Sequence, residues 1–245
     1  MNHAFLLNLH KDCAQGLKLV KFLHQHKASY RGWPRIYLSY DGPHEWPSEW
    51  DTLKPYADYA TTAPYAPDKA TGICSSLNRL ALRAMHDGVG VATLLHSDII
   101  PWHAAHFMGF LADFVESGKA MTYCPMWPKH KYASFIGPTF NLKKCYEQKI
   151  LPIRLDVMKK DDTGYCNEGL FSNHLKLIPG WREDIYPVWQ MTFPYTGQVE
   201  DPYALKLGHS VDEQFFVVND LVPESSIMHC NDERFWSNLQ HFCKW

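Results

Sequence analysis

The sequence lacks the features that mark secreted and membrane proteins. Its seven cysteines are scattered singly, without a C-x-x-C pair, a pattern that favours a reducing compartment in which thiols act as small hydrophobes. No early segment combines a basic start, a long apolar stretch and a small-residue cleavage site, so no secretory signal is predicted. No apolar run is long enough to span a bilayer. These absences predict a cytoplasmic protein without a membrane span.

An excess of charge and the common metal and nucleotide signatures are also missing. The formal net charge of -2 gives no electrostatic case for a protein that coats DNA or RNA. Although there are 14 histidines, no His-Glu-x-x-His motif occurs, and the pair His103/His106 has no third ligand at zinc-like spacing. After the first predicted strand stands Asn8-Leu9-His10-Lys11 instead of a glycine-rich, arginine-bearing loop, which disfavours a nucleotidyltransferase.

What is present begins with a strand, a helix and a second strand. Residues 4–9 and 35–40 are apolar strand patterns, and 11–27 repeats its apolar positions at helical spacing. This order predicts a βαβ unit with parallel strands, in a chain of 245 residues that is long enough for one domain with a sizeable core. Asp41, directly after the second strand, can accept hydrogen bonds from a ribose or base, or can bond its own backbone in the turn before Gly42.

An amphipathic helix is the next strong prediction. The stretch after the Gly42 turn predicts an ordered surface loop around a short strand at 56–61, and the helix follows with Thr71 as its N-cap. Lys69 precedes the predicted helix start, while Asn78 and Arg79 lie within the helix, an arrangement that suits an anionic ligand. Solvated charges on an exposed helix face are the alternative interpretation.

The stretch from Gly88 to Trp102 is the one around which the chain is organised. It begins as an uninterrupted apolar run, as does a strand buried on both faces of a parallel sheet, and it ends in His96-Ser97-Asp98. If the strand continues through Ser97, the His96 and Asp98 side chains point the same way. Ligands of open α/β sheets bind beyond the carboxyl ends of the strands, and imidazole with carboxylate suits a divalent cation and its phosphate ligands. Alternatively, Asp98 caps the following helix.

Together these motifs resemble the nucleotide-sugar glycosyltransferases of the GT-A fold, in particular the family-2-like enzymes. The resemblance rests on Lys69-x-x-Gly72, Asn78-Arg79, Gly88-Val89-Gly90 and the strand ending in His96-Ser97-Asp98. It implies an α/β, GT-A-like fold, in which a Rossmann-like, mostly parallel mixed sheet is flanked by helices. We expect one domain over 1–245, with a nucleotide-sugar-binding half at 1–118 and an acceptor-binding half at 119–245.

The resemblance also implies a donor site and a metal. The nucleotide-sugar donor would contact Asp41, Lys69, Asn78, Arg79, His96 and Asp98. Mn²⁺ or Mg²⁺ would be held by Asp98, together with His229 at the end of a predicted strand over 226–230. The chain departs from the family pattern at one point, because His96 stands where the first acidic residue of the Asp-x-Asp motif is expected.

The second half of the chain resembles the family more loosely. Residues 165–173 resemble the later strand that lines the acceptor side, and Gly180 opens the turn that commonly follows. His209 to Val218 resembles the acidic motif that supplies the catalytic base of inverting enzymes, a role that falls to either Asp212 or Glu213. Alternatively, these two carboxylates favour a helix dipole.

The function that follows from the resemblance is transfer of a hexosyl or pentosyl group. The donor would be a nucleoside-diphosphate sugar, with a UDP-sugar favoured, and the acceptor a hydroxyl group on a glycan or other polymer, reached by an inverting displacement. Two alternatives stay open: a catalytically silent nucleotide-sugar-binding protein on the same fold, and a phage enzyme that glycosylates DNA. The near-neutral charge disfavours duplex DNA as the acceptor.

Overall fold

The computed structural model describes residues 2–10, 13–30, 33–42, 48–64, 69–97, 99–101, 104–123, 137–157, 166–187, 191–192 and 227–229. Within these ranges a seven-stranded sheet has the order β3-β2-β1-β4-β7-β6-β8, and a second sheet has the order β5-β10-β9. The strands are β1 (His3–Leu9), β2 (Arg35–Tyr40), β3 (Tyr59–Thr62), β4 (Val91–Leu95), β5 (Ile99–Ile100), β6 (Met121–Tyr123), β7 (Thr139–Asn141), β8 (Ile185–Pro187), β9 (Met191–Thr192) and β10 (Ile227–His229). The helices are α1 (Cys13–Gln25), α2 (Ser48–Leu53), α3 (Lys69–His86), α4 (Ala104–Glu116), α5 (Leu142–Glu147) and α6 (Cys166–Leu175).

The large sheet is mixed and mostly parallel, as predicted. Strands β3, β2, β1 and β4 run parallel to one another, while β7 is antiparallel to both β4 and β6. All residues of β1 and β4 are buried, which explains their continuous apolar sequences. Because the four parallel strands end at one edge, the residues that follow β1, β2 and β4 are brought close together.

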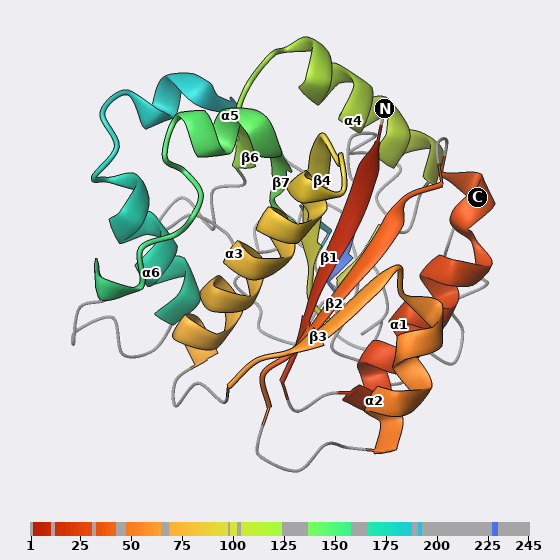
Figure 1. Cartoon of the computed structure of the whole chain (residues 1–245). Helices are drawn as coiled ribbons and strands as arrows, with labels where there is room; N and C mark the ends of the chain where they lie inside the picture. Colours follow the sequence, from red (N-terminus) through yellow and green to blue (C-terminus); the bar gives the residue numbers. More distant parts are fainter. Residues whose placement is uncertain are drawn as a thin grey trace, which may run out of the picture.

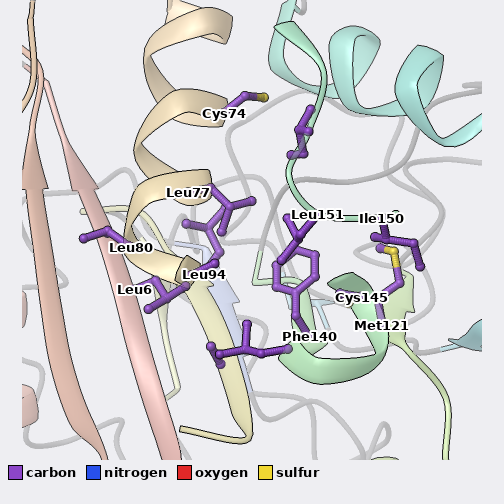
Figure 2. Packing of buried hydrophobic residues seen from close by; sticks show 14 of the residues in the cluster. Leu6, Cys74, Leu77, Leu80, Leu94, Met121, Phe140, Cys145, Ile150 and Leu151 are labelled. Carbon is purple, nitrogen blue, oxygen red and sulfur yellow. The ribbon is translucent and has the colours of Figure 1, made fainter. Parts of the chain in front are cut away.

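Helices cover both faces of this sheet (Figure 1). One core cluster joins alternate side chains of β1, β2 and β4 to α1, α2 and α4. The other joins the opposite side chains of the same strands to α3, α5 and α6, and Figure 2 shows this packing around Leu77, Leu80 and Phe140. Helix α3 ends at His86, and two residues later Gly88 has a φ of 80°, a left-handed backbone conformation that glycine adopts without strain. The carboxyl edge is therefore supported from both sides.

Several elements differ from the predictions. Residues 166–175 form helix α6 rather than a strand, since Leu170, Phe171 and Leu175 pack as one helical face in the α3 core. Helix α3 begins at Lys69, so Thr71 lies inside the first turn instead of capping it, because buried Ala70 extends the packed face.

Other differences are elements that the sequence pattern did not reveal. The predicted loop after Gly42 contains helix α2, which buries Trp50 and Leu53. The two-residue strand β5 and the short strand β7 were not predicted, because a few residues carry too little periodicity to identify them. Within the part of the chain that the structure describes, no helix is long and apolar enough to cross a membrane.

Candidate active site

The carboxylate of Asp41 lies buried at the carboxyl edge of the sheet. Its backbone N–H donates to the Leu9 carbonyl at 3.1 Å, which extends the parallel β1–β2 ladder by one step. The residue is 1% exposed. A buried carboxylate is costly unless other groups bond to it, so its surroundings decide what it can do.

Two side chains from the end of β1 approach this carboxylate. Nδ1 of His10 lies 3.2 Å from Oδ1 of Asp41, and the side chain of Asn8 also acts on the carboxyl group by lowering its pKa. Burial raises the pKa of the Asp41 carboxyl, and His10 and Asn8 oppose that rise. Its other oxygen, Oδ2, is buried and has no hydrogen-bond partner among the described residues. Asp41 therefore keeps an acceptor available for a ligand.

Gly42 allows the chain to pass close to this site. A Cβ at residue 42 would lie 2.0 Å from the His10 carbonyl oxygen and 2.3 Å from the Tyr40 hydroxyl. Neither contact is sterically possible, so any side chain here would displace the end of β1 or the Tyr40 ring. The sequence prediction of a turn at Asp41-Gly42 is consistent with this position, but the reason for the glycine is close packing.

The end of β4 forms the next part of the edge. Strand β4 stops at Leu95 and the chain turns at Ser97, so the condition under which His96 and Asp98 would point the same way, a strand that continues through Ser97, is not met. His96 is half-buried and Ser97 is buried. The next residue, Asp98, lies outside the described residues. The chain then enters β5, where it leaves the large sheet and pairs with a separate one.

Strand β10 returns a distant part of the chain to this position. It pairs antiparallel with β5, and His229 stands opposite Ile99 in the register. Ile99, the residue that follows Asp98, is thus paired with His229, which comes more than half the chain length later in the sequence. The structure describes only the backbone at these two strands, and the strand predicted at 226–230 is confirmed over Ile227–His229.

A buried tyrosine holds the segment that follows β5. The Tyr30 hydroxyl donates to the Pro101 carbonyl at 2.7 Å, and Tyr30 itself is fully buried. Its ring packs edge-on against Phe5 of β1 and against Phe107 of α4. The exit from the His96-Ser97-Asp98 motif is thereby tied to the core on the α1 side of the sheet.

The three predicted donor residues of α3 have different surroundings. Asn78 donates to the Ile153 carbonyl at 2.8 Å and accepts from the Ile153 N–H at 2.7 Å, so both ends of its amide are used. Arg79 reaches the Thr62 carbonyl at the end of β3 with one Nη at 3.5 Å, while its Nε is buried and has no hydrogen-bond partner among the described residues. Lys69 is the first residue of the helix, at its N-terminal end.

The remaining predicted site residues are the candidate bases Asp212 and Glu213 and the metal ligands Asp98 and His229. Asp212 and Glu213 lie outside the described residues. Among the described side chains, no three His, Cys, Asp or Glu residues converge as metal ligands. The side chains of the predicted ligands Asp98 and His229 are not among those described.

Solved structures with a similar arrangement of strands and helices include glycosyltransferases. The WbbM bifunctional glycosyltransferase matches 98% of this chain and 49% of its own, with 9% identity and a TM-score of 0.59. A glycosyltransferase involved in glycosylation of the PBCV-1 major capsid matches 98% of this chain and all (100%) of its own, with 10% identity and a TM-score of 0.56. The chain has a glycosyltransferase fold.

A third structure extends this likeness to an animal protein. Mouse xyloside xylosyltransferase 1 matches 94% of this chain and 98% of its own, at 10% identity and a TM-score of 0.52. Comparison with family models and with curated proteins finds no match. At such low identities the likeness is one of fold, so the roles of individual residues must be argued from the site itself.

Sequence reasoning did not identify Asn8 and His10 as site residues. Both follow the apolar run of β1 two residues apart, the same spacing as His96 and Asp98 after β4. Polar residues at alternate positions where a buried strand ends were therefore an available signal. Only the parallel pairing of β1 with β2 reveals that their shared partner is Asp41.

Proposed function

We propose that the protein is a glycosyltransferase that moves a sugar from a nucleoside-diphosphate donor to a hydroxyl acceptor. The observation that carries the proposal is the buried Asp41 carboxylate with its unbonded Oδ2, at the edge where α/β sheets bind ligands. A nucleoside offers ribose hydroxyl and base N–H donors to such an acceptor. The shared fold with glycosyltransferases supports the same reaction class. A UDP-sugar is the favoured donor.

The donor and acceptor would occupy successive parts of the carboxyl edge. The nucleoside would lie over β1 and β2 beside Asp41, and the diphosphate toward Arg79, Lys69 and the end of β4. The buried Nε of Arg79, to which no described residue bonds, is a suitable donor to an anion or a base carbonyl. We assign this donor half to residues 1–118 of a single domain, and the acceptor half to 119–245.

The reaction we propose is a single inverting displacement. Asp212 or Glu213 accepts the proton of the acceptor hydroxyl, whose oxygen forms a bond to the anomeric carbon while the bond from that carbon to the phosphate oxygen breaks. The products are the glycosylated acceptor and the nucleoside diphosphate. A general base of this kind contributes roughly 10²–10⁴-fold to such a step.

A divalent cation fits the residues at the end of β4. Carboxylate oxygen and imidazole nitrogen together suit Mn²⁺, and the β5–β10 pairing sets His229 opposite Ile99, next to Asp98 in the sequence. We propose that Asp98 and His229 hold the ion, with His96 beside the diphosphate. When bound, the ion would neutralise charge on the leaving diphosphate.

The direct test is release of nucleoside diphosphate from a panel of nucleotide sugars, in the presence of Mn²⁺ or Mg²⁺ and a panel of acceptors. We expect UDP release that EDTA abolishes and Mn²⁺ restores. Asp98→Ala should reduce turnover at least about 100-fold, since removal of a ligand that positions the ion costs that much or more. His86→Ala is the matched control, because His86 is exposed at the opposite end of α3.

Other outcomes would contradict the proposal. Pyrophosphate release instead of nucleoside diphosphate release would identify a nucleotidyltransferase. Donor binding without turnover for any acceptor would identify a silent binding protein. Unchanged turnover in folded Asp98→Ala would remove Asp98 from the mechanism.

A further inference from the structure

We infer that His10 is a positioning residue, which holds the Asp41 carboxylate so that its free oxygen contacts the nucleoside part of the donor. This inference rests on the proposed function, and it adds a residue to which neither the sequence pattern nor the comparisons assign a role. The carboxylate is reached from β1 by His10 and Asn8 only because β1 and β2 pair in parallel, with Leu9 opposite Tyr40.

The geometry leaves little choice in how the two side chains are bonded. An ionised carboxylate only accepts hydrogen bonds, so the Nδ1 atom of His10 must carry the proton that it shares with Oδ1 of Asp41 over 3.2 Å. The His10 side chain is 24% exposed and the Asp41 side chain is 2% exposed, so the pair joins a buried carboxylate to a partly exposed imidazole at the carboxyl edge of the sheet. The bond fixes the plane of the carboxylate, and with it the direction of Oδ2.

A second buried polar atom lies next to the same pair. Asn8 is 6% exposed, lowers the pKa of the Asp41 carboxyl, and has an Oδ1 atom without a hydrogen-bond partner among the described residues. Buried polar atoms are rarely left unbonded unless a ligand or water completes them. Unbonded acceptors on both Asn8 and Asp41 suit a ligand with several hydrogen-bond donors, such as the ribose hydroxyls and base N–H of a nucleoside.

A positioning role and a purely structural role of His10 predict different effects on different ligands of the site. If His10 only stabilised the fold, its removal would weaken every ligand of the site alike. If it orients Asp41 toward the nucleoside, its removal weakens ligands that contain a nucleoside and spares those that contain only the diphosphate.

The experiment measures binding of UDP and of inorganic pyrophosphate, each with Mn²⁺, to the full chain by titration calorimetry. We expect His10→Ala to weaken UDP binding about tenfold, the usual scale for a hydrogen bond to a charged group, and to leave pyrophosphate binding within about twofold. His10→Asn can place an amide N–H near the position of Nδ1 and should restore most of the UDP affinity. His10→Gln, whose amide extends to the position of Nε2, should not restore it.

Each result decides the inference. Equal UDP affinity in wild-type and His10→Ala protein, or equal loss for UDP and pyrophosphate, would overturn it. If His10→Ala does not fold, the comparison of the Asn and Gln variants decides, and equal UDP affinity in those two would overturn it as well. Failure of the wild-type protein to bind any nucleoside diphosphate would instead overturn the proposed function, a result that is visible before any variant is made.

Discussion

Replacement of Asn78 by alanine should destabilise the protein more than it weakens nucleotide binding. Both polar ends of the Asn78 amide bond to the backbone of Ile153, at 2.8 and 2.7 Å, and Ile153 is 2% exposed. Alanine leaves a buried N–H and a buried C=O unbonded, at about 1–3 kcal/mol each if no water replaces the amide. Because Asn78 is half-buried, water will recover part of this loss.

The net effect follows from these opposing contributions. Alanine favours the helix over asparagine by about 0.5 kcal/mol, which offsets part of the cost. We therefore expect a loss of about 2 kcal/mol in the free energy of unfolding, or about 4–8 °C in Tm for a domain of this size. Urea unfolding followed by circular dichroism gives the free energy, and calorimetric titration with UDP gives the affinity at a temperature where the variant is folded.

Two further variants make the measurement specific. Asn78→Leu retains the side-chain volume without the hydrogen bonds and should lose as much stability as the alanine variant. Leu82→Ala, on the exposed face of the same helix, is the control and should change stability by less than about 1 kcal/mol. Wild-type stability of Asn78→Ala together with a loss of UDP affinity would refute this expectation. Asn78 would then contact the ligand instead of linking α3 to the segment before α6 by hydrogen bonds.

Three other perturbations have defined outcomes. Burial lowers the pKa of His3 from 6.5 to about 3, so the unfolded chain takes up a proton there that the folded protein does not. Stability is therefore lost as pH falls below 6.5, and His3→Gln, which can still bond Thr93, should reduce the loss between pH 7 and pH 4.5 by about 2–3 kcal/mol in urea titrations. Tyr30→Phe removes the donor to the Pro101 carbonyl and should cost about 1–3 kcal/mol by the same assay, whereas no change would mean that water replaces the hydroxyl. Gly42→Ala should cost about 1–3 kcal/mol and weaken UDP binding, because its Cβ would overlap the His10 carbonyl; wild-type behaviour would show that the strand ends yield easily.

The strands and helices with a long apolar pattern were predictable from sequence. β2 was predicted at its observed bounds, and the helix predicted over 11–27 is α1, Cys13–Gln25, most of whose apolar positions at helical spacing are buried. Short or mixed segments were not predictable. Residues 165–173 were predicted as a strand by resemblance, although packing against α3 makes Cys166–Leu175 a helix.

The candidate site was predictable only in part. Asp41 was identified because a polar residue after a buried strand of an α/β sheet faces the ligand edge. The partners of that carboxylate come from another strand, and no local pattern connects positions 10 and 41. Asn78 was predicted to contact the donor because of its neighbours in sequence, yet its amide bonds to Ile153 on a distant segment.

The sequence by itself determined the class of fold, because continuous apolar runs alternating with amphipathic helices can be buried only as a mostly parallel sheet between helical layers. The tertiary structure alone decided which polar groups meet. Parallel pairing of β1 with β2 brings His10 to Asp41, and antiparallel pairing of β5 with β10 sets His229 opposite Ile99. The register of strand pairing brings together residues that are far apart in the chain. The type of a residue does not indicate which residue it will face across a sheet.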